Sequence, residues 1–182
     1  AAISQAHTEV LEELLQQGAE ANQPVAGYPP LNLACLSGVP EQVALLPECG
    51  ADSAAVDANG QNALHASAVF LSSDKARLDA VILVDMLIRA GVSVTAADIH
   101  QQTPLHLLCG AALQKGQVLK EGLVLSAIDR LLRESPDIDA VDARGFSALH
   151  HCAARGYGQL VDCLLQAGAD KHRRDNLGRS AS

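Results

Sequence analysis

A phrase of five residues occurs four times in this chain and constrains its fold more than any other feature. The four copies are Tyr28-Pro29-Pro30-Leu31-Asn32, Gln61-Asn62-Ala63-Leu64-His65, Gln102-Thr103-Pro104-Leu105-His106 and Phe146-Ser147-Ala148-Leu149-His150. Each copy leads, one helix later, to a Leu-rich run that closes near a Gly-Ala-Asp triplet, as at Gly168-Ala169-Asp170. Self-similarity at a period of roughly 33 residues is typical of a solenoid built from stacked units.

The composition agrees with thin helical layers. Hydrophobic residues make up 48% of the chain, yet aromatic residues make up only 2%. The core must therefore be built from Ala, Leu, Val and Cys, which allows helices to lie close together. A sandwich or barrel would require β-branched runs and aromatic residues, so the sequence favours an all-α fold.

Helical spacing of apolar residues predicts helices over residues 7–18, 31–37, 41–49 and 63–71. Pro47 lies inside the third of these ranges. A proline removes a backbone donor from a helix interior and is expected to kink or shorten it.

Two units are longer than the others by eight and eleven residues, and the extra residues lie at about 72–81 and 112–122. From each insertion into the helix that follows it, apolar residues recur every fourth position, which predicts that the second helices are lengthened at their start. These residues are Leu78, Ile82 and Met86 in one unit and Leu119, Leu123, Ala127 and Leu131 in the next. Together the insertions are expected to form one thickened edge on the side away from the fingers, which is either a second interface or a docking surface for a neighbouring domain.

The repeated phrase resembles the Thr-Pro-Leu-His-x-Ala phrase of the ankyrin repeat, a unit of one β-turn and two antiparallel helices. The resemblance covers about residues 1–178 and implies an ankyrin-repeat solenoid with β-turn fingers. It places the units at about 1–27 (partial), 28–57, 58–97, 98–141, 142–174 and 175–182 (partial). Asn32 replaces the histidine in one copy, and Ala63 and Ala148 replace the proline in two. The chain begins without Met and partway through a unit, so we expect it to be one domain of a longer protein.

The resemblance implies a binding surface formed by the finger turns and the concave face of the first helices. Large, aromatic, amide or charged residues at such positions are the candidates for partner contacts. They are Tyr28, Asn59, Gln61, Phe70, Ile99, His100, Arg144, Phe146, Arg155 and Asn176. An equally weighted alternative places Phe70 in the interior, beneath an insertion.

The titratable residues have structural explanations. His65, His106 and His150 stand one unit apart, too far for a single metal ion, and in an ankyrin-like stack each bonds the backbone of the neighbouring unit. Asp52, Asp57, Asp98, Asp142, Asp170 and Asp175 recur at turns, where Asx-turns account for them. No phosphate-binding glycine motif occurs, and neither a catalytic site, a metal site nor a cofactor is predicted.

Five cysteines without a paired spacing predict free thiols, hence a reducing compartment, the cytoplasm or the nucleus. The net charge of −8 argues against direct nucleic-acid binding and fits a protein partner with a basic surface. Neither membrane insertion nor a small-molecule substrate is expected.

The sequence predicts a non-enzymatic protein-interaction module of an adaptor or regulatory protein. Its uneven units and the run from Gln101 to Leu107 are similar to the inhibitor-of-NF-kappa-B group. The alternative is a substrate-recruiting segment of a larger enzyme or bacterial effector.

Overall fold

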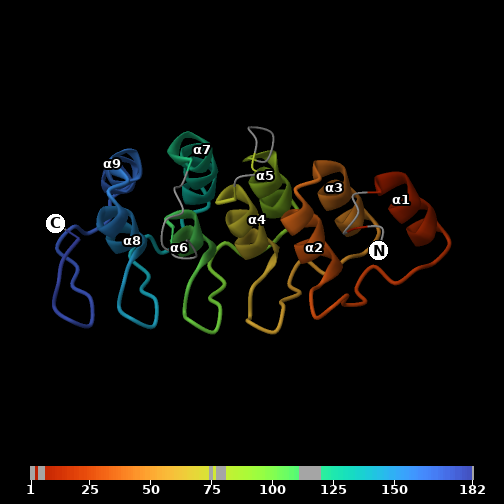
Figure 1. The fold of residues 1–182 in the computed structure, drawn as a ribbon, viewed down its shortest axis with the longest axis horizontal. Coiled ribbons are helices and arrows are strands. Elements are labelled where there is room, and N and C mark those ends of the chain that lie inside the picture. The colour runs from red at the N-terminus through yellow and green to blue at the C-terminus, as the bar shows by residue number, and fades with distance from the viewer. Residues whose placement is uncertain (1–2, 4–6, 74–75, 77–80, 111–119, 182) are drawn as a thin grey trace.

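The computed structural model describes residues 3, 7–73, 76, 81–110 and 120–181. Figure 1 shows helices in two rows, with hairpin loops projecting from one edge and the two termini near opposite ends. The row nearer the hairpins, called here the inner row, contains α2 (Pro30–Ser37), α4 (Ala63–Leu71), α6 (Pro104–Leu108) and α8 (Ala148–Arg155). The outer row contains α1 (Thr8–Gln16), α3 (Pro40–Glu48), α5 (Ile82–Arg89), α7 (Glu121–Leu132) and α9 (Gly158–Gln166). The all-α solenoid expected from the sequence is confirmed.

Three inner helices begin with the same reciprocal cap. Asn62, Thr103 and Ser147 are the N-cap residues of α4, α6 and α8, and the side chain of each accepts a backbone N–H three residues later. The histidine at that third position returns the bond, because its Nδ1 accepts the N–H of the N-cap residue at 3.1–3.2 Å. Two of the four unpaired donors at each helix start are thereby satisfied. The histidines of the repeated phrase thus define where these helices begin.

The leucine of every phrase is buried in the stack. Leu31, Leu64, Leu105 and Leu149 expose at most 2% of their surface. Small residues lie on the same helices, among them Ala34, Cys35 and Ala68, each fully buried. They let α2 approach α4 and let α4 approach α6 closely enough to pack. Burial raises the pKa of the Cys35 and Cys109 thiols, so both remain protonated and act as small apolar side chains.

Pro47 does not shorten α3, so the shortening expected from the sequence was wrong, and the kink stays a prediction. The helix spans Pro40–Glu48, nine residues, with Pro47 inside it. Pro47 lies in the last turn, so its missing N–H costs only one intrahelical bond. The N–H groups of Cys49 and Gly50 still close the helix on Leu45, Leu46 and Pro47.

The lengthening predicted for the helix after the first insertion falls mostly outside the described residues, and within α5 the series at Ile82 and Met86 is not the most buried one. Ile82 is 49% exposed, whereas Leu83 and Leu87 are fully buried. The stripe predicted for α7 is confirmed at Ala127 and Leu131, which are fully buried, whereas Leu123 is only half-buried. Most of both insertions, including Leu78 and Leu119, lies outside the described residues, so the thickened edge stays a prediction. In the part of the chain that the structure describes, no helix is long and apolar enough to cross a membrane.

Candidate functional site

Four finger turns are built around buried aspartates, at Asp57, Asp98, Asp142 and Asp175. In each turn Oδ1 of the aspartate accepts two backbone N–H groups, from residues two and four positions later, at 2.8–2.9 Å. The backbone N–H of the aspartate donates to the carbonyl four residues later, which closes the hairpin. Each carboxylate therefore holds one finger in a fixed shape, as the Asx-turn interpretation predicted.

Adjacent fingers are joined to one another through their backbones. The N–H of Ile99 donates to the carbonyl of Asn59 at 2.9 Å, and the N–H of Ala143 donates to that of His100 at 2.9 Å. The N–H of Asn176 donates to the carbonyl of Arg144 at 3.3 Å. The tips are thus held in register along the row of hairpins shown in Figure 1.

The histidines of the phrase connect each inner helix to the next finger. Since Nδ1 accepts a bond within the cap, Nε2 carries the proton and donates to a carbonyl of the following unit. Nε2 of His65 lies 2.9 Å from the carbonyl oxygen of Gln102, and Nε2 of His150 lies 3.2 Å from that of Arg179. Asn32, which replaces histidine, makes the equivalent bond to Gln61 through Nδ2 at 2.8 Å. The structural role predicted for these side chains is confirmed.

A further buried histidine, His151, which no sequence pattern singled out, completes the Asp142 turn. His151 Nε2 lies 3.1 Å from Asp142 Oδ2, and both side chains are at most 5% exposed. Burial and the neighbouring His106 lower the pKa of His151 to about 4, although Asp142 opposes the shift. His151 is therefore neutral near pH 7, and its Nε2–H donates a hydrogen bond to the carboxylate of Asp142. Within the described residues, no three or more His, Cys, Asp or Glu side chains are placed to hold a metal ion.

Most of the predicted contact residues lie on exposed tips. Ile99 exposes 60% of its surface and Tyr28 38%. The remaining exposed members of the predicted set are Asn59, His100, Arg144, Arg155 and Asn176. Arg155 lies apart from the fingers, at the end of α8.

The other three predicted residues are engaged within the fold. Gln61 Nε2 donates to Asp98 Oδ2 of the next finger at 3.1 Å. The Phe70 ring lies over Gly38, where any β-carbon would collide with it, so Phe70 fills space between α2 and α4. The Phe146 ring lies beneath two guanidinium groups, with the carbon of Arg144 at 4.9 Å and that of Arg179 at 5.5 Å from its centre.

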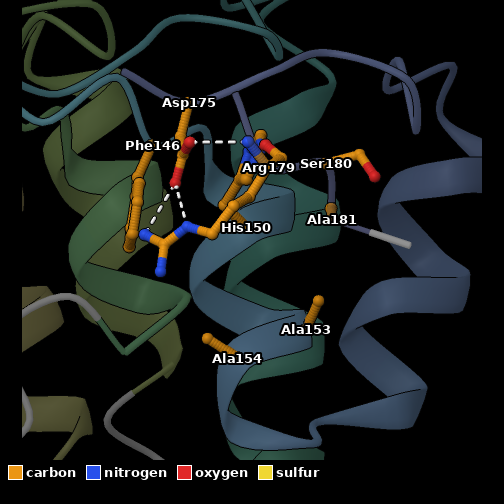
Figure 2. A pocket seen from close by; sticks show the side chains of 8 residues that line it. All are labelled: Phe146, His150, Ala153, Ala154, Asp175, Arg179, Ser180 and Ala181. Carbon is orange, nitrogen blue, oxygen red and sulfur yellow. Dashed lines mark hydrogen bonds and ion pairs between the residues drawn. The ribbon is translucent and has the colours of Figure 1, made fainter. Parts of the chain in front are cut away.

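Two pockets occupy equivalent places in the repeat, each between an inner helix and the finger of the next unit. The first, about 110 Å³, brings together Tyr28, Asn59 and Gln61 above Leu36 of α2. The second, about 260 Å³, lies beside Phe146 and Arg179, with Ala153 and Ala154 of α8 as its floor (Figure 2). Ala154 corresponds to Leu36, and the first pocket is also lined by Ala66 and Val69 of the next inner helix, α4.

The charges of the chain are unevenly distributed along the solenoid. Residues 1–141 contain 7 Lys and Arg against 17 Asp and Glu, whereas residues 142–182 contain 6 against 4. Two of those four acids, Asp142 and Asp175, are buried in their turns. Four exposed basic residues lie in the final finger: Lys171, Arg173, Arg174 and Arg179. One end of the row is therefore basic although the whole chain is acidic.

Comparison with known proteins agrees with this architecture. A model of three ankyrin repeats matches residues 1–81, and a single-repeat model matches residues 144–176, so together they cover more than half of the chain. The mouse B-cell lymphoma 3 protein homolog is 28% identical over 164 residues, which are 78% of this chain and 36% of that protein. The chicken nuclear factor NF-kappa-B p105 subunit is 30% identical over 166 residues, 90% of this chain and 15% of that protein. A human ankyrin repeat and SOCS box protein, number 16, is 28% identical over 199 residues, 92% of this chain and 42% of that protein. The chain spans less than half the length of each of these relatives. It belongs to the ankyrin-repeat family.

Proposed function

We propose that this chain is a non-enzymatic recognition module that binds a partner protein through its finger tips and the adjoining surface of its inner helices. The module would act within an adaptor or a regulator of transcription, in the cytoplasm or the nucleus. The relatives named for NF-kappa-B and for B-cell lymphoma 3 support the regulatory role.

One observation carries the proposal: large apolar side chains are exposed on turns that the fold holds rigid. Ile99 is 60% exposed and directly follows Asp98, and Leu177 is 76% exposed and follows Asp175 by two residues; both aspartates fix their fingers. Exposed apolar side chains on a pre-formed surface favour association, because little conformational freedom is lost on binding. The core does not require either residue at its position.

A pair of matched substitutions tests the proposal. Ile99→Asp places a charge on a finger tip, whereas Ile82→Asp places the same charge on the outer helix α5, where Ile82 is 49% exposed. We expect Ile99→Asp to lose most of the proteins that the wild type retains on an affinity column, because an apolar contact is replaced by a desolvated charge. Ile82→Asp should retain them. Equal retention by both variants would contradict the finger assignment.

A further inference from the structure

The first pocket lies between two inner helices that pack on each other, α2 and α4, beside the finger that contains Asp57. Its volume is about 110 Å³, and Leu36, Ala66 and Val69 supply its apolar lining. The polar part of the lining includes two hydrogen-bond acceptors that the repeat leaves without donors. They belong to Asn32 and Asp57.

The first acceptor is the side-chain oxygen of Asn32, a residue that is 1% exposed. In α4, α6 and α8 the equivalent residue is a histidine whose Nδ1 accepts the N–H of the N-cap residue. The N-cap residue of α2 is Pro29, which has no N–H to donate. Asn32 uses Nδ2 to bond the carbonyl of Gln61, and its Oδ1 has no hydrogen-bond partner among the described residues. A buried acceptor without a donor is destabilising, so this site favours a ligand that supplies one.

The second acceptor is the carboxylate of Asp57. Its Oδ1 accepts two backbone N–H groups, as in the other fingers. In the next two fingers Oδ2 of the aspartate is occupied as well, because Gln61 donates to Asp98 at 3.1 Å and His151 donates to Asp142 at 3.1 Å. Within the part of the chain that the structure describes, Oδ2 of Asp57 has no such donor. This oxygen is therefore available to a ligand.

The charges around the first pocket favour a cation. Residues 1–73 contain eight Asp and Glu and no Lys or Arg, and the finger at residues 93–102 contains no Lys or Arg either. A surface of one sign raises the local concentration of groups of the opposite sign and the rate at which they arrive. A cationic side chain thus meets an attractive field on its way to the two acceptors.

The lining matches lysine better than arginine. The lysine ammonium is a compact charge with three N–H donors, carried on an apolar four-carbon stem. Two of its donors suit Asn32 Oδ1 and Asp57 Oδ2, and the stem suits Leu36 and Val69. Arginine binds best to both oxygens of one carboxylate, and Oδ1 of Asp57 is already occupied by two backbone N–H groups.

We infer that the first pocket binds a lysine side chain of the partner protein, with its ammonium between Asn32 Oδ1 and Asp57 Oδ2. The inference rests on the proposed function and adds the chemistry that the partner presents to this part of the finger row. A nucleic acid is a poorer match, because its phosphates would approach an acidic surface. The equivalent place in the next unit does not take a lysine, because His65 donates from Nε2 and Gln61 occupies Asp98.

Conservative substitutions remove each acceptor and preserve the fold. Asp57→Asn keeps an oxygen for the two backbone N–H groups and replaces the available oxygen by an N–H donor. Asn32→His introduces the residue found at the equivalent His65, which keeps the bond to the following carbonyl and removes the amide oxygen. Glu48→Gln is the matched control for charge, since it removes one exposed acid from α3.

The test is a fluorescence-anisotropy titration of the whole chain with a labelled peptide that alternates lysine and serine. The comparison peptides are the same peptide with every lysine acetylated and a peptide that alternates arginine and serine. We expect saturable binding of the lysine peptide that weakens with added salt, about tenfold weaker binding by Asp57→Asn and about fivefold weaker binding by Asn32→His. On the wild type, the acetylated and arginine peptides should each bind about tenfold more weakly than the lysine peptide. Glu48→Gln should stay within about twofold of the wild type.

Several results would overturn the inference. Equal binding of the lysine and arginine peptides, or equal losses in Asp57→Asn and Glu48→Gln, would assign the binding to general negative charge. Absence of binding by the lysine peptide would remove the site, and self-association that competes with the peptide would identify a second copy of the chain as the occupant. The three peptides are compared on the wild type, so this part of the test holds even if a variant does not fold.

The outcome for the first pocket is separable from the outcome for the proposed function. Failure of the lysine peptide, with Ile99→Asp still losing its partners, would remove the lysine site and leave the proposed function standing. Failure of both measurements would remove the proposed function as well.

Discussion

Replacing Asp142 by alanine is expected to lower the free energy of unfolding by about 3–5 kcal/mol, because each buried donor left without its acceptor costs about 1–3 kcal/mol. The carboxylate is 1% exposed and accepts bonds from two backbone N–H groups, from His151 and from Arg144. Alanine leaves the two backbone donors and the histidine donor without an acceptor in the interior. Chemical denaturation followed by circular dichroism measures the loss.

Two companion variants make this prediction specific. Asp142→Asn retains an oxygen for the two backbone N–H groups, and its amide can donate to the other tautomer of His151, so a smaller loss is expected. Asp162→Ala on α9 removes an exposed aspartate and should change stability by less than about 0.5 kcal/mol. A loss below about 1 kcal/mol in Asp142→Ala would show that the carboxylate does not hold the finger.

Acidification from pH 6.5 to pH 4 is expected to destabilise the fold by an amount on the order of 3 kcal/mol through His151. Its pKa falls from the ordinary value of 6.5 to about 4 in the folded state, because burial disfavours the charged ring. The unfolded chain therefore binds a proton that the folded chain excludes throughout this interval. Stability from this group is complete above pH 6.5 and is lost progressively down to about pH 4. Burial lowers the pKa of His65 and His106 in the same direction.

The variant His151→Gln isolates this contribution. An amide can donate to Asp142 Oδ2 as the imidazole does, but it does not titrate. Denaturation midpoints measured from pH 7.5 to pH 4 should fall less steeply for His151→Gln than for the wild type. Parallel pH profiles would contradict the assignment of the acid sensitivity to His151, which faces His106, Asp142 and Arg144.

The inner row of helices could be predicted from the sequence because the repeated phrase carries its own local signals. Asn62 and His65 encode the start of α4, and Leu64 encodes its buried face, all within one turn of chain. The Asx-turns could be predicted for the same reason. Contacts between residues of one unit recur in every repeat, so each such contact can be predicted from several copies of the same sequence pattern.

Other features depend on packing between units, which the spacing of residues within one unit does not predict. In α5 both Ile82 with Met86 and Leu83 with Leu87 recur at a spacing of four, and only packing decides which pair is buried. The position of Phe146 beneath Arg144 and Arg179 joins two different fingers, a contact that the spacing within one unit does not predict.

The most direct test of the binding surface is site-specific photocrosslinking. A benzoylphenylalanine introduced at Ile99 reports on proteins that contact a finger tip, and the same group at Ile82 reports on the outer helices. Both side chains are exposed, so both probes are accessible in the free protein. We expect irradiation in extracts to yield a discrete crosslinked protein from position 99 and none from position 82. A crosslinked protein from position 82 alone would contradict recognition through the fingers.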